Sequence, residues 1–129
     1  MEIKNAKIVG TSISMADHGC LSISISVVGD NWACNIGGWC NGVGHLGAKE
    51  WRGNGSAIVA MMKIMDIVGV DKWENLTGKC IRVKLKGIGG TIDEIGSLIE
   101  DKWFNLREFY NTDIGQATFI LKEGEEEEQ

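Results

Sequence analysis

GSAIVAMMKIMDIVGV, residues 55–70, is the one stretch of the sequence that reads plainly as a helix, and it decides the fold. Ser56 marks the start, because its hydroxyl can accept a hydrogen bond from an unpaired N–H of the first turn. Gly69 marks the end, because glycine readily adopts the left-handed conformation that terminates helices. Only Lys63 and Asp66 are charged between these points. A helix with so little polar surface has to be covered by a sheet on one side and by a partner subunit or a second layer on the other.

The apolar residues of this helix include a stripe that contains three methionines. Spacings of three and four place the stripe on one face of the helix. We interpret the methionines as core-filling side chains rather than as the lining of a binding groove. The apolar surface on nearly all sides also predicts a homo-oligomer formed through this Met-rich helix. The stripe consists of Ile58, Met61, Met62, Met65 and Val68.

The residues before the helix predict an antiparallel meander of three strands joined by short turns. The first strand covers residues 2–15 and changes its inward parity near Gly10, which indicates a bulge and turns Ile13 inward after it. The second strand, residues 21–27, alternates Leu, Ile and Val with serine, so one face packs and the other is polar but uncharged. The third strand covers residues 32–39.

The residues after the helix predict a short helical turn and then further strands. The turn covers residues 71–76, and a fourth strand with regular alternation covers residues 80–85. Residues 91–104 fit either a bent strand or a short helix, and we favour the strand. Residues 116–121 fit one more edge strand. The fold class is therefore α+β, with an antiparallel sheet of about five strands in the order β-β-β-α-β-β packed on one main helix.

The length of 129 residues fits a single domain. We expect residues 1–110 to form this α+β domain, residues 111–122 to add an edge strand, and residues 123–129 to be a disordered acidic tail. Five of the 18 acidic residues lie in that tail, so the rest of the chain is close to neutral. This balance argues against a basic nucleic-acid binder, and we expect neither DNA nor RNA as a partner. A tail that mimics DNA is the less favoured alternative.

The chain contains no apolar run long enough to span a bilayer, and its first residues, MEIKNAKIVG, lack the apolar core of a signal peptide. We therefore expect a cytoplasmic protein without a membrane partner, whose four cysteines are thiols. Cys34, Cys40 and His45 are close in sequence, and Cys20 or His18 could complete a set of four ligands. Their spacing is not that of a structural zinc site, so no metal is expected.

The glycine-rich connection into the helix, residues 40–55, contains the best site candidate. A helix N-terminus offers unpaired N–H groups and partial positive charge, and nearby basic side chains would add full charges for an anion. The pattern is neither a P-loop nor a dinucleotide-binding fingerprint, and a well-capped helix after a flexible loop is the competing interpretation. The candidate ligand-binding residues are Trp39, Lys49, Trp51, Arg52, Gly53, Gly55 and Ser56.

Tryptophans near this connection could stack on the base of a nucleotide. Trp32 and Trp39 are separated by an odd number of positions, so a regular strand places them on opposite faces and at most one of them reaches the site. The other is then a core residue. A basic row on the fourth strand, which we interpret as a solvated face rather than a phosphate site, consists of Arg82, Lys84 and Lys86.

Catalytic patterns are missing from the sequence. It contains no nucleophile with a base at a recognisable spacing and no paired carboxylates in a glycine-rich setting. We therefore expect a protein that is not an enzyme and that uses no cofactor.

Several motifs together resemble a group of small uncharacterised proteins from phage and prophage genomes. The resemblance covers roughly residues 2–105 and leaves out the acidic tail. It is carried by IKNAKIVGTS at residues 3–12, ADHG at 16–19, GGW at 37–39, MMKIMDIVGVDKWENLTGKCIRVK at 61–84 and IEDKWF at 99–104.

This resemblance implies an accessory protein made during infection and acting in the host cytoplasm. Small phage proteins of this kind often counter host defence, either by sequestering a nucleotide signal or by occluding a protein. The first reading, a sponge for a cyclic nucleotide or another anionic small ligand, agrees with the anion site inferred from Arg52, Gly53, Gly55 and Ser56. The alternative is a protein-binding inhibitor of a host defence system, or a structural phage protein without a small ligand.

Overall fold

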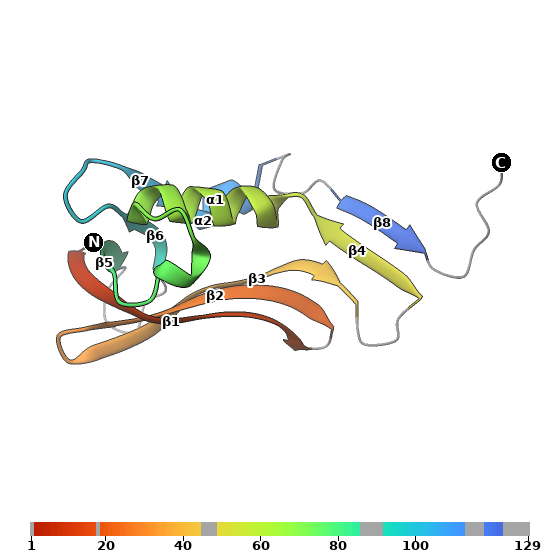
Figure 1. The fold of residues 1–129 in the computed structure, drawn as a ribbon, viewed down its shortest axis with the longest axis horizontal. Coiled ribbons are helices and arrows are strands. Elements are labelled where there is room, and N and C mark those ends of the chain that lie inside the picture. The colour runs from red at the N-terminus through yellow and green to blue at the C-terminus, as the bar shows by residue number, and fades with distance from the viewer. Residues whose placement is uncertain (1, 18, 45–48, 86–91, 113–117, 123–129) are drawn as a thin grey trace.

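The computed structural model describes residues 2–17, 19–44, 49–85, 92–112 and 118–122. One antiparallel sheet of eight strands dominates this part of the chain, and helix α1 lies over it (Figure 1). The strands are β1 (Glu2–Asp17), β2 (Cys20–Gly29), β3 (Trp32–Val43), β4 (Glu50–Asn54), β5 (Cys80–Leu85), β6 (Ile92–Gly96), β7 (Trp103–Asn105) and β8 (Thr118–Lys122). The helices are α1 (Ser56–Val68), the 3-10 turn η1 (Trp73–Asn75) and α2 (Leu106–Tyr110).

The prediction of about five strands packed on one main helix is wrong. The strand order is β7-β6-β5-β1-β2-β3-β4-β8, and two short helices accompany the sheet. Three short strands account for the difference. Residues 92–105 form two strands, β6 and β7, instead of one bent strand, the segment read as a loop before α1 contains β4, and β8, expected as an additional edge strand, belongs to the same sheet. These strands are too short to show a regular alternation of apolar and polar residues, so their pairing with distant strands decides their structure.

Strand β1 joins the two halves of the sheet, because it is long enough to pair with β5 near its start and with β2 farther along. Its register against β2 shifts between Ile8 and Gly10, which confirms the predicted bulge. The predicted inward parity of Ile13 is confirmed, since it pairs with the buried Ile23 and so lies on the same face, but Ile13 is still 48% exposed. This pair lies in the second half of β1, beyond Ile8, the last residue of β1 in the main core cluster.

The predicted meander of β1, β2 and β3 is confirmed. Ile23, Ile25 and Val27 of β2 are buried, and the serines between them lie on the other face. Strand β3 continues past the predicted end to Val43 and carries an irregularity at Gly37, whose φ of 104° belongs to the region that favours glycine. Such bulges increase the local twist and bend of a strand.

Helix α1 packs on the sheet through Ala60, Ile64 and Ile67, which are at most 3% exposed. Ile58 and Met62 face outward and are 68% and 61% exposed, so the interpretation of the methionines as core filling is wrong for Met62. Apolar residues on nearly every side give the helical pattern too little contrast to show which side packs.

The sequence predicts the C-terminal end of α1 correctly but not the cap at its N-terminal end. Gly69 ends the helix in the left-handed conformation, with φ 88°, and donates its N–H to the Met65 carbonyl over 2.8 Å, as predicted. At the other end the N-cap is Gly55, and no side-chain hydrogen bond caps the helix. The expected cap by Ser56 is therefore wrong, because Ser56 is already the first helical residue.

The turn predicted over residues 71–76 is confirmed as η1 and its flanks. Leu76 is fully buried, and the Trp73 indole Nε1 donates to the Thr11 hydroxyl over 3.1 Å. Gly78 follows with φ 94° and donates its N–H to the Ile8 carbonyl, so the turn is tied to β1. Leu76 and Ile8, on either side of this contact, both belong to the hydrophobic core.

The sheet curls around the core, since β3 contacts β6 although the two strands are not neighbours in the sheet. Helix α2 contacts both α1 and β6. Asn105 caps α2 by accepting a hydrogen bond from the Glu108 N–H over 3.0 Å.

Strands β4 and β8 form a two-stranded arm that extends from the body of the protein beside the N-terminal end of α1 (Figure 1). Among the described residues, the arm joins β3 through the pairs Gly42 with Gly53 and Val43 with Arg52, and through a hydrogen bond from the Asn54 amide to the Cys40 carbonyl over 3.3 Å. Strand β8, Thr118–Lys122, overlaps the range expected for an edge strand, and the acidic tail lies outside the described residues.

Candidate functional site

The segment that leads into α1 is a strand for most of its length. Strand β4 lies between β3 and β8, so its backbone N–H groups point along the sheet toward those strands. Gly53 is paired on both sides, with Gly42 and Phe119, and its amide is therefore not arranged to wrap an anion. The unpaired N–H groups that remain belong to the first turn of α1, after Gly55.

Arg52 lies on one face of this arm in a small ionic cluster. Its Nε donates to Glu50 Oε2 over 3.1 Å, and Lys122 Nζ lies 3.9 Å from Glu50 Oε1. The side chains of Arg52 and Glu50 are 54% and 43% exposed. Lys49, just before the strand, is also exposed. The described charges on β4, β8 and the residue before β4 are therefore three basic groups against one carboxylate.

Trp51 lies on the opposite face of the arm from Arg52, because neighbouring residues of a strand point to opposite sides. It is paired with Leu121, and its ring packs so closely on Gly44 that a Cβ there would lie 2.5 Å from it. The indole Nε1 is buried and has no partner among the described residues. The structure thus does not bring Trp51 and Arg52 together around one ligand.

Trp39 lies in the body of the protein, where its ring stacks on Tyr110 at 5.2 Å with an interplanar angle of 15°. The Tyr110 hydroxyl donates to Oδ1 of the buried Asn41 over 2.7 Å, and the amide of Asn41 donates to the Trp39 carbonyl. Burial raises the pKa of the Tyr110 phenol above its ordinary value, and the bond to Asn41 offsets part of this rise. Trp39 and Tyr110 are thus both partly buried, and the pair packs against the core.

The sequence interpretation missed a second polar contact beside this pair. Arg107 of α2 binds the carboxylate of the buried Asp93 through Nε at 2.8 Å and Nη2 at 3.2 Å, and its guanidinium lies 5.9 Å from the centre of the Trp39 ring. Hydrogen bonding and charge from Asp93 raise the pKa of Arg107. The two residues are distant in sequence, so no local motif indicates their pairing. This ion pair and the Tyr110 bond fix α2 to β6 and β3.

The basic row on β5 is occupied by contacts within the chain. Arg82 donates to the carbonyls of Ser97 and Glu100 over 2.6 and 2.7 Å, and Lys84 Nζ lies 3.0 Å from Glu94 Oε2. Both cations also lie over the Trp103 ring, 4.8 and 4.4 Å from its centre. The third member of the row, Lys86, lies outside the described residues.

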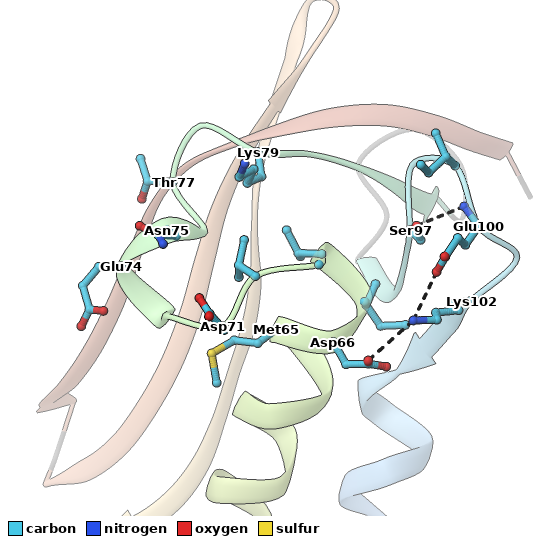
Figure 2. Close-up of a pocket in the computed structure, with 15 residues that line it drawn as sticks. Met65, Asp66, Asp71, Glu74, Asn75, Thr77, Lys79, Ser97, Glu100 and Lys102 are labelled. Atoms are coloured by element: carbon cyan, nitrogen blue, oxygen red, sulfur yellow. Dashed lines mark hydrogen bonds and ion pairs between the residues drawn. The ribbon is translucent and has the colours of Figure 1, made fainter.

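An open cavity lies at the opposite end of α1 from the arm and has a volume of about 1080 Å³ (Figure 2). It is lined by the last turn of α1, the η1 segment and the connection from β6 to β7. No sequence motif pointed to it, because its walls come from three separate segments. Its labelled polar residues are Asp66, Asp71, Glu74, Asn75, Thr77, Lys79, Ser97, Glu100 and Lys102.

Potential metal ligands are not clustered in the part of the chain that the structure describes. All four cysteines are free thiols, and no group of three or more potential metal ligands occurs among those residues. His18 and His45, considered for zinc, lie outside them. No helix of the described ranges is long and apolar enough to cross a membrane.

No protein-family model, no curated protein and no solved structure matches the chain. The resemblance to phage proteins therefore stays a prediction that rests on the motifs quoted above.

Proposed function

We propose that this protein binds a phosphate-bearing small ligand stoichiometrically at the N-terminal end of α1, without chemical turnover. The observation that carries the proposal is the electrostatics of that end. No side chain caps the helix and no acidic residue lies in its first turn, so its N–H groups and partial positive charge are not offset locally. Only Gly53 and Asn54 lie between Arg52 and Gly55 in the sequence, and the Arg52 side chain adds a full positive charge.

The ligand class that we propose is a nucleotide immune signal of the host, in line with the phage resemblance and with action in the host cytoplasm. The phosphate would bind the first turn of α1, including Gly55 and Ser56, with Arg52 and Lys49 as its cationic partners. Stacking of the base on Trp51 at the same time receives no support, since Trp51 lies on the other face of β4. Trp39 already stacks on Tyr110.

The test of this proposal uses the contact between Arg52 and Glu50. Glu50 competes with a ligand for the guanidinium, so Glu50→Gln should tighten binding by severalfold, whereas Arg52→Ala should abolish it. Lys7→Ala is the matched control, because it removes one positive charge from an exposed side chain on β1. Calorimetry with a cyclic dinucleotide should give the tightest binding for Glu50→Gln, unchanged binding for Lys7→Ala and no binding for Arg52→Ala. Equal affinity in all three variants would contradict the proposed site.

A second candidate function is protein binding through the outer side of α1, as an inhibitor of host defence or a structural phage component. The observation in its favour is the exposure of three apolar side chains on that side, namely Ile58, Val59 and Met62 at 68%, 37% and 61%. The same surface supports our proposal of a homo-oligomer through α1. Sedimentation of the wild type and of an Ile58→Glu, Met62→Glu variant tests this point: a dimer that becomes a monomer supports it, and a monomer in both contradicts it.

A further inference from the structure

The cavity at the C-terminal end of α1 has an electrostatic character opposite to that of the N-terminal end. Its lining includes four carboxylates, Asp66, Asp71, Glu74 and Glu100, against two ammonium groups, Lys79 and Lys102. The carbonyl end of a helix also carries partial negative charge, and no basic residue lies in the last turn of α1 to offset it. A cavity of this composition favours a cation over an anion.

One wall of the cavity already holds an ammonium group of the protein itself. Lys102 Nζ lies 3.2 Å from Glu100 Oε2 and 3.6 Å from Asp66 Oδ1, and both contacts are visible in Figure 2. Glu100 is held in turn, because its N–H donates to the hydroxyl of Ser97, which is 7% exposed. The hydrogen bond that Lys102 donates to the Glu100 carboxylate and the charge of Asp66 raise the pKa of Lys102.

The other wall carries carboxylates that form no ion pair like those of Lys102. Asp71 and Glu74 come from the segment around η1 and lie across the cavity from Lys102 in Figure 2. No ion pair joins either of them to another described residue, and both are exposed. The volume of 1080 Å³ between the walls is ample for a small organic ligand.

Apolar side chains complete the lining between these polar walls. Met65, Val68 and Val70 line the cavity, and Ile99 on the β6 to β7 connection also lines it although it is 89% exposed. An isoleucine so open to solvent contributes little to the core, but it can cover the methylene groups of a ligand. Carboxylates together with short apolar surfaces match an alkyl chain that ends in ammonium groups.

We propose that this cavity is a binding site for a linear alkylpolyamine, with Asp71 and Glu74 as the carboxylates that hold its free ammonium groups. The alkyl segment lies along Val70 and Ile99, and the carbonyl end of α1 adds to the attraction. The site goes beyond the proposed anion function, since it lies at the other end of α1 and binds ligands of opposite charge.

The experiment is a titration of the full chain with spermidine at 150 mM salt. Calorimetry measures the affinity, and amide chemical shifts locate the bound ligand. At this salt concentration the Debye length is about 8 Å, so weak attraction to scattered surface charge is screened. The double variant Asp71→Asn, Glu74→Gln keeps the shape of the wall and removes its charge. We expect it to bind spermidine at least ~10-fold more weakly, as loss of two charge-assisted hydrogen bonds implies.

Two controls separate this site from other acidic places on the chain. Asp30→Asn with Glu2→Gln removes two exposed carboxylates elsewhere, and substitution of Glu123 and glutamates 125–128 by glutamine removes the five glutamate charges of the tail. Wild-type affinity in both controls, with shift changes confined to residues 65–79 and 97–102, supports the proposal. Loss of binding in the tail variant alone would overturn it, as would no binding at millimolar spermidine.

Discussion

Substitution of Gly37 by alanine should destabilise the protein far more than the same substitution at two other glycines. Gly37 has a φ of 104°, and a Cβ added there would lie 2.3 Å from the Ile23 carbonyl oxygen of β2. Alanine therefore meets a strained backbone conformation and also a collision with backbone that cannot rotate away. The backbone term alone is about 1–2 kcal/mol, and the forced shift of β3 from β2 raises the total to roughly 3 kcal/mol or more.

Gly38 and Gly10 serve as matched controls that separate the cost of the backbone conformation from the cost of the steric collision. Gly38 has a φ of 93° but no atom within 4 Å of an added Cβ, so Gly38→Ala should cost only the backbone term, about 1–2 kcal/mol. Gly10 has free space as well and a φ outside the left-handed region. Gly10→Ala should therefore change the free energy of unfolding by less than about 0.5 kcal/mol or stabilise the protein slightly, since alanine lowers the entropy of the unfolded chain.

The assay is urea unfolding at pH 7, followed by tryptophan fluorescence and by circular dichroism, with the free energy of unfolding extrapolated for each variant. The expected order of destabilisation is Gly37→Ala, then Gly38→Ala, then Gly10→Ala. A Gly37→Ala protein as stable as the Gly10→Ala protein would refute the described register between β2 and β3 at this bulge.

Leu76→Ala should lower the free energy of unfolding by about 2–5 kcal/mol, because Leu76 is fully buried beneath α1 and its removal leaves a cavity; a loss below about 1 kcal/mol in urea unfolding would contradict the packing of η1. The phenol of Tyr110 should titrate above the ordinary value of about 10, because burial raises its pKa. The unfolded chain then releases this proton first as the pH rises, so stability falls above about pH 10. Tyr110 is the only tyrosine, so ultraviolet titration of the native protein reports on this group alone, and Tyr110→Phe should lessen the loss of stability; an ordinary or lowered pKa would argue against its burial.

The sequence predicts the parts of this fold that local pattern determines. The alternation in β2 and the pair Ile81 and Val83 in β5 identify buried faces, since every second residue is apolar. Gly69 ends α1 as predicted, because a left-handed residue is needed there and glycine adopts it at no steric cost.

Other parts depend on partners that are distant along the chain. Strand β4 has the sequence EWRGN, which has no strand pattern of its own, and it is a strand because β3 and β8 pair with it. The orientation of α1 was not predictable from periodicity, since apolar residues occur on nearly all its sides. The sheet and α2 were needed to show that Ile64 is buried and Met62 is exposed.

The candidate site was predictable only in its coarsest feature, the basic approach to a helix N-terminus. Arg52 and Gly55 lie there as the sequence order requires, but the separation of Arg52 from Trp51 follows from the strand geometry of β4. The stacking of Trp39 on Tyr110 joins residues from β3 and α2. No spacing rule connects such distant positions.

The proposed function is tested most directly by isothermal titration calorimetry of the full chain against cyclic di- and trinucleotides and cyclic ADP-ribose isomers. We predict binding at micromolar or tighter affinity for at least one of these ligands, with one ligand per α1 N-terminus, loss of binding in Arg52→Ala and unchanged binding in Lys7→Ala. Absence of heat with every ligand, or full binding by Arg52→Ala, would contradict the proposal and favour protein binding through the exposed side of α1.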